Sequence, residues 1–320
     1  MWRNRMIVML AGLLMVGVWA WGEDEPLPKG AIGAVKLDVL YELAFSPAGD
    51  LLGVATHGGV VLYSVPELEE VGTFSLPGSA YSVAFSADGR YLAAGTYPAV
   101  VVWDYRTGEE VARKEGDFGI VYALAFTPNG ERLLFGAGDG TVALWDFLGD
   151  QVLWSGTHSG AVRGVAVSPD GTMCASGSMT QGILWDISGE TLFTFPGKAW
   201  NVAFSPDNYF LAIGSGKVVI LWDTAVGLQY RYMWEHTGCV WWVEFSSNGK
   251  WLASASLDHT VKIWDWEAGH SLVTLEAHQD SVECVRFSSD SRLLASGSGD
   301  GQLYLWDLGE LLNSPEGNTE

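Results

Sequence analysis

One unit occurs seven times along this chain, and that repeat constrains the fold more than any other feature. Each unit contains two characteristic residues. The first anchor is Phe or Val, and the second anchor is Trp or Tyr at the end of an apolar or β-branched run. The first anchors are Phe45, Phe85, Phe126, Val167, Phe204, Phe245 and Phe287. The second anchors are Tyr63, Trp103, Trp145, Trp185, Trp222, Trp264 and Trp306. Anchors of one kind lie 37 to 42 residues apart, so the repeat covers most of the 320 residues.

The runs between anchors have the pattern of short β-strands. Residues 100–103, 142–145 and 218–222 are apolar or β-branched and are bounded by glycine-rich turns. Asp-Gly and Asn-Gly pairs, as at residues 88–89 and 248–249, favour hairpin connections. Apart from the apolar N-terminus, no segment has helical periodicity. The sequence therefore predicts an all-β protein.

Aspartate follows six of the seven second anchors, at Asp104, Asp146, Asp186, Asp223, Asp265 and Asp307, whereas the first unit has Ser64 there. This pattern resembles the WD40 repeat family. The resemblance implies a seven-bladed β-propeller with four strands in each blade. A repeat of this length suits one blade, because a single four-stranded sheet must stack on its neighbours to bury both faces.

The resemblance also predicts how the ring closes. Only 13 residues follow Asp307, and residues 31–35 precede the first blade without a sheet of their own. We therefore expect the N-terminal strand to pair with the last blade, which removes the exposed edges of an open array. The expected organisation is a signal peptide (1–22), an acidic, proline-containing spacer (23–30), a propeller (31–308) and a C-terminal tail (309–320). We expect a monomeric ring.

The N-terminus has the pattern of a secretory signal. Arg3 and Arg5 precede an uncharged apolar run from residue 6 to residue 21, and Ala20 and Gly22 supply small residues for cleavage before Glu23. This run of 16 residues is shorter than the roughly 20 residues of a spanning helix. We expect export to a periplasmic or extracellular location. The alternative is an uncleaved anchor, which would add membrane contact.

Charge and cysteine content restrict the function further. The chain carries 38 acidic and 17 basic residues, a formal net charge of -21, which disfavours binding to nucleic acid or to an anionic membrane surface. The three cysteines, Cys174, Cys239 and Cys284, lie in apolar strand-like runs, which indicates thiols rather than a disulfide framework.

Two units contain sets of residues that look like catalytic triads. These sets are His236, Ser254, Asp258 and Trp264 in the sixth unit, and His278, Ser296, Asp300 and Trp306 in the seventh. In WD40 proteins such residues resemble a structural tetrad that links the strands of one blade. Repetition at identical spacing favours this structural role over a Ser-His-Asp active site, so we expect no catalytic residues here.

The resemblance also indicates a binding site. In the family, the residue four positions before the first anchor faces the top of the central channel, where partners dock. Those positions, called here the mouth residues, are Tyr41, Tyr81, Tyr122, Arg163, Trp200, Trp241 and Glu283. Tyr and Trp are enriched at binding hot spots, so we interpret these residues as a partner-binding surface, to which His57 and Tyr97 could contribute. The alternative is that the rings only pack across a narrow channel.

Several sites are not indicated by the sequence. No zinc, calcium or phosphate-loop motif occurs, so we predict no metal and no cofactor. The favoured function is a non-enzymatic scaffold that binds a protein or peptide outside the cytoplasm. A lectin-like, carbohydrate-binding propeller is the alternative, because Tyr and Trp also stack on sugars. A propeller enzyme using Arg163 and Glu283 is less favoured, because arginine rarely gives up its proton.

Overall fold

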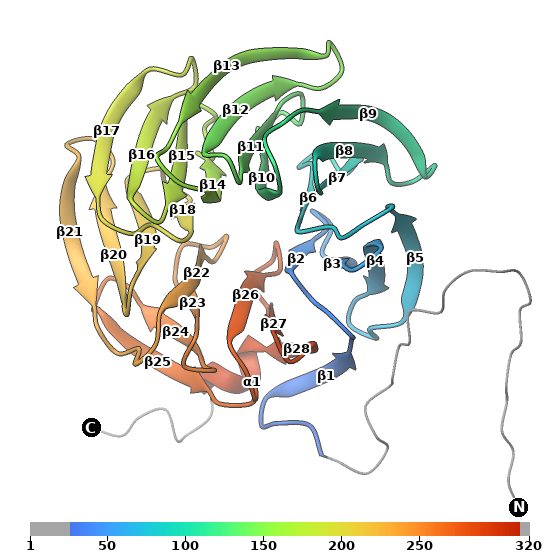
Figure 1. Ribbon diagram of the computed structural model, residues 1–320. Coiled ribbons are helices and arrows are strands. Elements are labelled where there is room, and N and C mark those ends of the chain that lie inside the picture. Colours follow the sequence, from blue (N-terminus) through green and yellow to red (C-terminus); the bar gives the residue numbers. More distant parts are fainter. Residues whose placement is uncertain (1–25, 314–320) are drawn as a thin grey trace, which may run out of the picture.

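The computed structural model of the protein describes residues 26–313. Its strands form seven four-stranded sheets around a central axis, like the blades of a propeller (Figure 1). Every neighbouring pair of strands is antiparallel, as in β2–β3 and β26–β27. The predicted all-β, seven-bladed fold is confirmed.

Within each blade the strands run in order from the channel to the rim. The innermost strands are β2 (Glu42–Phe45), β6 (Ser82–Phe85), β10 (Val121–Phe126), β14 (Val162–Val167), β18 (Val202–Phe204), β22 (Val240–Phe245) and β26 (Val282–Phe287). The second strands are β3 (Leu51–Thr56), β7 (Tyr91–Gly95), β11 (Leu133–Ala137), β15 (Met173–Ser178), β19 (Phe210–Ser215), β23 (Leu252–Ser256) and β27 (Leu293–Ser298). First anchors thus end the innermost strands, just before the turn to the second strand.

Second anchors lie on the third strands, which are β4 (Gly59–Ser64), β8 (Ala99–Asp104), β12 (Thr141–Asp146), β16 (Gln181–Asp186), β20 (Val218–Asp223), β24 (Val261–Asp265) and β28 (Gln302–Asp307). The outermost strands are β5 (Glu70–Ser75), β9 (Glu109–Glu115), β13 (Gln151–Thr157), β17 (Thr191–Pro196), β21 (Leu228–Met233), β25 (His270–Leu275) and β1 (Ala31–Lys36). Most second anchors are buried between blades, including Trp145 and Trp264, each 0% exposed. Burial of these large side chains explains why the repeat needs an aromatic residue there.

The ring closes as expected. Strand β1 pairs antiparallel with β28, with Val35 opposite Leu303, and Figure 1 shows these two strands side by side in the last blade. Val35, Leu52 and Leu303 belong to one apolar cluster that joins the last blade to the first. Packing as well as strand pairing therefore holds the closure.

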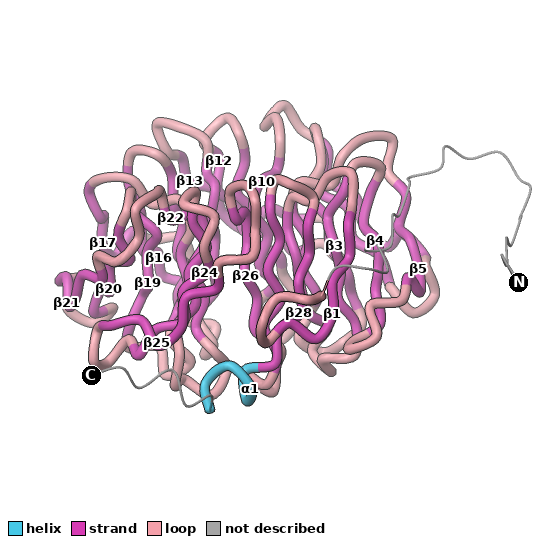
Figure 2. The backbone as a smooth tube through the Cα atoms, turned by 90° about the horizontal axis from the view of Figure 1, so that it is seen from below, coloured by secondary structure: helices cyan, strands magenta, loops and turns pink. Residues whose placement is uncertain are grey.

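The segment predicted as a C-terminal tail, 309–320, begins within a helix. A short helix, α1 (Leu308–Asn313), follows β28 directly and lies at one side of the ring (Figure 2). Leu308, Leu311 and Leu312 pack into the apolar cluster between the sixth and seventh blades. Their i, i+3, i+4 spacing is the helical signal in this segment. Among residues 26–313 no helix is long and apolar enough to cross a membrane. Residues 1–22, for which a signal peptide is predicted, lie outside the described part.

Candidate functional site

All seven mouth residues line one cavity of about 260 Å³, together with Glu42 and Trp242. We call it the upper cavity; it lies at the end of the channel where the innermost strands begin. Because each mouth residue comes from a different blade, the site exists only in the closed ring. The structure thus brings together every residue that the sequence placed there.

The mouth rings also contact one another. Ring centroids of Tyr41 and Tyr81 are 4.9 Å apart, and those of Trp200 and Trp241 are 4.3 Å apart. The guanidinium of Arg163 lies 3.8 Å from the centroid of the Tyr122 ring, a cation–π contact. Trp200 is only 8% exposed, whereas the other six mouth residues are partly exposed. The rings therefore pack along the channel wall and still border open space.

Three acidic or basic groups from three blades line the upper cavity, Arg163, Glu283 and Glu42. Burial raises the pKa of Glu283, and a hydrogen bond from the Ser281 hydroxyl partly offsets that rise. Arg163 forms no ion pair within the described part of the chain. The cavity lining thus contains one guanidinium and two carboxyl groups among neutral rings, and the carboxyl of Glu42 is paired with Arg286.

The two additional residues suggested for the mouth behave differently. His57 Nδ1 lies 3.0 Å from Ser79 Oγ, which in turn lies 3.5 Å from the Tyr41 hydroxyl. His57 is therefore connected to the mouth through Ser79. Tyr97 is 67% exposed and does not line the upper cavity. Only His57 is placed to support the site.

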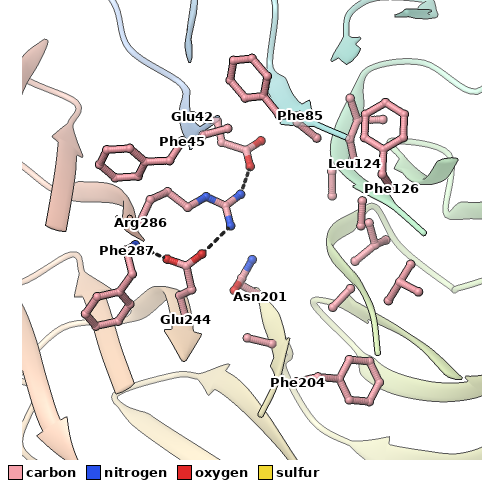
Figure 3. Close-up of a pocket in the computed structure, with 18 of the residues that line it drawn as sticks. Glu42, Phe45, Phe85, Leu124, Phe126, Asn201, Phe204, Glu244, Arg286 and Phe287 are labelled. Atoms are coloured by element: carbon pink, nitrogen blue, oxygen red, sulfur yellow. Dashed lines mark hydrogen bonds and ion pairs between the residues drawn. The ribbon is translucent and has the colours of Figure 1, made fainter. Parts of the chain in front are cut away.

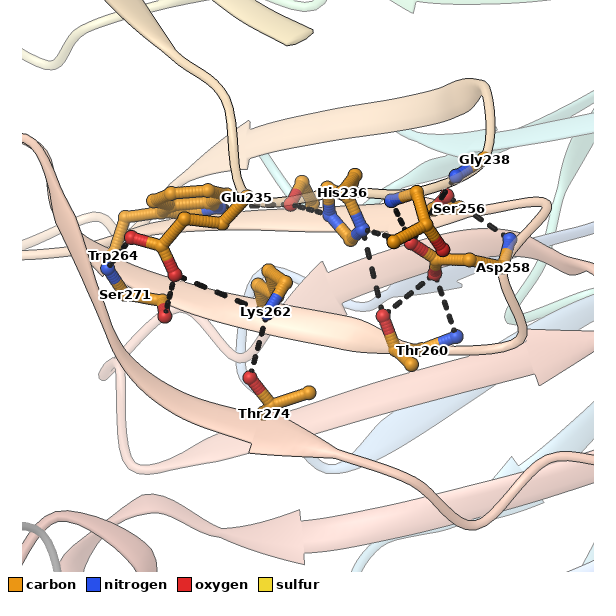
Figure 4. A network of polar contacts seen from close by, with 12 residues as sticks. Glu235, His236, Gly238, Ser256, Asp258, Thr260, Lys262, Trp264, Ser271 and Thr274 are labelled. Atoms are coloured by element: carbon orange, nitrogen blue, oxygen red, sulfur yellow. Dashed lines mark hydrogen bonds and ion pairs between the residues drawn. The ribbon is translucent and has the colours of Figure 1, made fainter. Parts of the chain in front are cut away.

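The sixth blade contains a complete tetrad (Figure 4). Trp264 Nε1 donates to Ser254 Oγ at 2.8 Å, and Ser254 Oγ lies 2.7 Å from His236 Nε2. His236 Nδ1 donates to the Asp258 carboxylate at 2.9 Å. Burial opposes ionisation of Asp258, but hydrogen bonds from His236 and Thr260 lower its pKa overall. Ser254 is 0% exposed, so this hydroxyl cannot reach a substrate.

The tetrad of the seventh blade is incomplete. His278 Nε2 lies 2.7 Å from Ser296 Oγ, and Trp306 Nε1 donates to the same oxygen at 2.9 Å. Asp300 instead accepts from the backbone N–H groups of Gln279 and Gln302. His278 Nδ1 has no partner within residues 26–313, and burial lowers the pKa of His278 to about 4. The expected link between Asp300 and His278 is therefore absent from the structure.

The fourth blade has an equivalent network that lacks the acid. His158 Nε2 lies 2.8 Å from Ser176 Oγ, which accepts from Trp185 Nε1 at 2.8 Å. The Ser178 hydroxyl, 3.1 Å from His158 Nδ1, takes the place of the aspartate. The signal in the sequence is Thr180, which stands four residues after Ser176, where the sixth unit has Asp258.

A second cavity, of about 390 Å³, occupies the opposite end of the channel (Figure 3). We call it the lower cavity; all seven first anchors line it, together with Glu42, Asn201, Glu244 and Arg286. Glu42 and Trp242 border both cavities and so lie between them. Sequence reasoning missed this site, although charged residues inside apolar strands were a visible signal.

Arg286 joins three blades at this point. Its guanidinium forms an ion pair with Glu42 and a longer one, 3.4 Å, with Glu244, and Nε donates to the Leu43 carbonyl at 2.9 Å. It also lies 4.3 Å from the centroid of the Trp242 ring. Burial raises the pKa of Glu42 to about 7, although Arg286 acts in the opposite direction. Burial likewise raises the pKa of Glu244.

The described residues hold no group of three or more His, Cys, Asp or Glu side chains suited to a metal ion. The three cysteines are free thiols, and Cys174 and Cys284 are buried. Burial raises the pKa of Cys174 to about 12, as expected for an unreactive thiol.

Comparison with known proteins places the repeat in a family. The model of the WD domain, G-beta repeat, matches six segments: 69–104, 108–146, 151–186, 189–223, 229–265 and 269–307. Serine-threonine kinase receptor-associated protein of Rattus norvegicus is 29% identical over 104 residues, 32% of this chain and 30% of that protein. WD repeat-containing protein SL1-17 of Schistosoma mansoni is 34% identical over 106 residues, 32% of this chain and 34% of that protein.

These alignments span about a third of each relative, so they establish the repeat and not a shared activity. The six matched repeats cover well over half of the chain, and the structure adds the first blade, which the family model does not match in full. This chain belongs to the WD40 repeat family, whose propellers generally act as non-catalytic scaffolds for protein interactions.

Proposed function

We propose that this protein is a non-enzymatic scaffold that binds a protein or peptide partner at the upper cavity, outside the cytoplasm. The observation that carries the proposal is that seven residues from seven blades meet around one cavity and that five of them are Tyr or Trp. Rigid aromatic side chains provide contact area at low entropic cost. The charged pair Arg163 and Glu283 could fix the orientation of a partner segment.

The extracytoplasmic location rests on the pattern of residues 1–22 alone. A positively charged start, an uncharged apolar run and small residues before Glu23 are typical of export signals. N-terminal sequencing of the protein purified from its native cells tests this part. A chain that begins near Glu23 supports export, and a cytoplasmic chain that begins at Met1 contradicts it.

Partner capture tests the binding site. The full chain and a Trp241→Ala variant are used as baits in native extracts, with Trp234→Ala as the matched control, because Trp234 is 68% exposed and lies outside the upper cavity. We expect Trp241→Ala to lose a partner that the wild type and the control retain. Removal of a hot-spot aromatic costs about 2 kcal/mol or more, roughly a thirtyfold loss of affinity. Equal capture by all three baits would place the partner elsewhere.

A glycan array distinguishes the carbohydrate-binding alternative. The rings of Tyr41 and Tyr81 are tilted by 51° and those of Trp200 and Trp241 by 61°, so neither pair forms a flat platform for a sugar ring. This geometry favours the peptide partner. Strong binding to a neutral glycan, lost in Trp241→Ala, would reverse that preference.

A further inference from the structure

We infer that the lower cavity is a second binding site, for a small primary amine that carries an adjacent carbonyl and an apolar group, as in an amino-acid amide or the first residue of a peptide. The site is separate from the upper cavity and does not depend on the function proposed there. Three features of the cavity carry the inference: an apolar ring, a carboxylate that shares its cation with a second carboxyl group, and an amide donor without a protein acceptor.

The apolar ring is supplied by the repeat itself. Six phenylalanines and Val167 surround the cavity, one from the end of each innermost strand. A volume of about 390 Å³ lies within the range of small-ligand sites. These side chains can bury an aromatic or aliphatic group, but they cannot bind its polar end.

The polar end of the cavity holds two carboxyl groups and one guanidinium. Glu42 and Glu244 share the single guanidinium of Arg286. Both Glu42 oxygens are already bonded, to Arg286 and to the Val83 N–H, and its side chain is 3% exposed. The Glu244 oxygens are also bonded, to Arg286 at 3.4 Å and to the Phe287 N–H at 2.7 Å, but the Glu244 side chain is 23% exposed and its contact with Arg286 is longer. An ammonium group would therefore bind at Glu244, where it balances the second carboxylate.

Asn201 provides an independent indication of a ligand. This residue is 4% exposed, and its Oδ1 accepts from the Val243 N–H at 3.2 Å, which fixes the orientation of the amide. Its Nδ2 donates to no acceptor in the described part of the chain, and Figure 3 shows the amide directed toward the cavity. This nitrogen borders the open space of the cavity, where a bound molecule can reach it. A ligand carbonyl next to the ammonium would supply the acceptor.

The net charge of the whole chain acts in the same direction. A formal charge of -21 raises the local concentration of cations around the molecule. An amine ligand is therefore attracted, whereas a carboxylate ligand of the same shape is repelled.

Calorimetric titration of the full chain with L-phenylalaninamide at pH 7 tests the inference. N-acetyl-L-phenylalaninamide, which has the same ring and carbonyl but no charge, is the matched control ligand. We expect the amine to bind at least about tenfold more tightly, because a hydrogen bond to a charged group is worth about 1.5–3 kcal/mol. 2-Phenylethylamine, which lacks the carbonyl, is expected to bind more weakly than the amide, since it leaves Asn201 unpaired.

Two variants connect any binding to this cavity. Glu244→Gln keeps an oxygen for the Phe287 N–H and removes the charge, so it should weaken phenylalaninamide about tenfold. Glu267→Gln, at an exposed position outside the cavity, should bind like the wild type. Circular dichroism establishes that both variants are folded. A tripeptide amide with an N-terminal phenylalanine shows whether the site accepts the first residue of a peptide or only a single amino-acid amide. Binding of the tripeptide amide or of phenylalaninamide supports the inference.

Three results would overturn it. They are no binding of any amine, equal binding of the amine and its acetylated control, or unchanged binding by Glu244→Gln. Trp241→Ala separates this site from the upper cavity, because it should leave amine binding unchanged whether or not it loses a protein partner. Failure of one proposal is therefore distinguishable from failure of the other.

Discussion

Ser254 shows how one small side chain can determine the stability of a blade. Its hydroxyl joins Trp264 on the third strand to His236 in the loop before the innermost strand, and it is fully buried. A buried hydrogen bond contributes only about 1 kcal/mol net, but an unpaired buried donor or acceptor costs about 1–3 kcal/mol. Ser254 therefore stabilises the blade mainly by giving a hydrogen-bond partner to both the Trp264 N–H and His236 Nε2.

Replacement of this hydroxyl provides a direct test. We expect Ser254→Ala to lower the free energy of unfolding by about 3 kcal/mol, because the Trp264 N–H and the His236 Nε2 both lose their partner. Urea denaturation measures the change. Ser155→Ala, at an exposed position on β13, is the control and should stay within about 0.5 kcal/mol of the wild type. A similar small effect for both variants would show that the network is energetically unimportant.

At the scale of the element, the seven blades share one strand topology but differ in the side-chain hydrogen bonds that connect their strands. The sixth blade has a four-residue network, the fourth blade has a version built on Ser178, and the seventh lacks the aspartate link. In the first and second blades, as the structure describes them, no buried serine links a histidine to the second anchor, Tyr63 or Trp103. These links were only partly predictable from sequence, since the expected tetrad of the seventh blade is open.

We expect amide hydrogen exchange to follow this inequality. Strands β23 and β15, which carry Ser254 and Ser176, should exchange more slowly than β3 and β7, which carry no tetrad serine. Mass spectrometry of peptic fragments gives the order under native conditions. Faster exchange in the sixth blade than in the first and second would contradict a stabilising role for the tetrads.

At the scale of the whole molecule, the sequence was most informative about the features that recur in every blade. Anchor spacing determined the blade number, and the incomplete last unit determined the closing strand, because both follow from burying sheet faces. What does not repeat was harder to predict. Glu42, Glu244 and Arg286 have no identical residue at the same position of any other blade, and they are far apart in sequence. Only the closed ring therefore brings their charges together. The α1 helix likewise belongs to no repeat, since within residues 26–313 it packs only against the sixth and seventh blades.

Burial of Glu42 makes the contact between the first and last blades sensitive to pH, and Arg286 reduces that sensitivity. Arg286 links the first, sixth and seventh blades through Glu42, Glu244 and Leu43. The pKa of Glu42 is about 7 in the folded chain, above its usual value near 4.5. A carboxyl whose pKa is raised by folding stabilises the fold fully below pH 4.5, and this contribution is lost as pH rises through 7. The neutral form of Glu42 is therefore the one that the fold favours.

Removal of the guanidinium should strengthen this dependence. We expect Arg286→Met to lower the free energy of unfolding by about 3–5 kcal/mol at pH 8, where two buried carboxylates lose their only cation. At pH 5 the loss should be smaller, because the carboxyl groups can take up protons instead. Glu42→Gln added to Arg286→Met removes one of the two charges, so it should recover part of the loss at pH 8 and little at pH 5. Denaturation at both pH values measures all three chains, and an equal loss at pH 5 and pH 8 would show that Arg286 acts through packing on Trp242 rather than through charge.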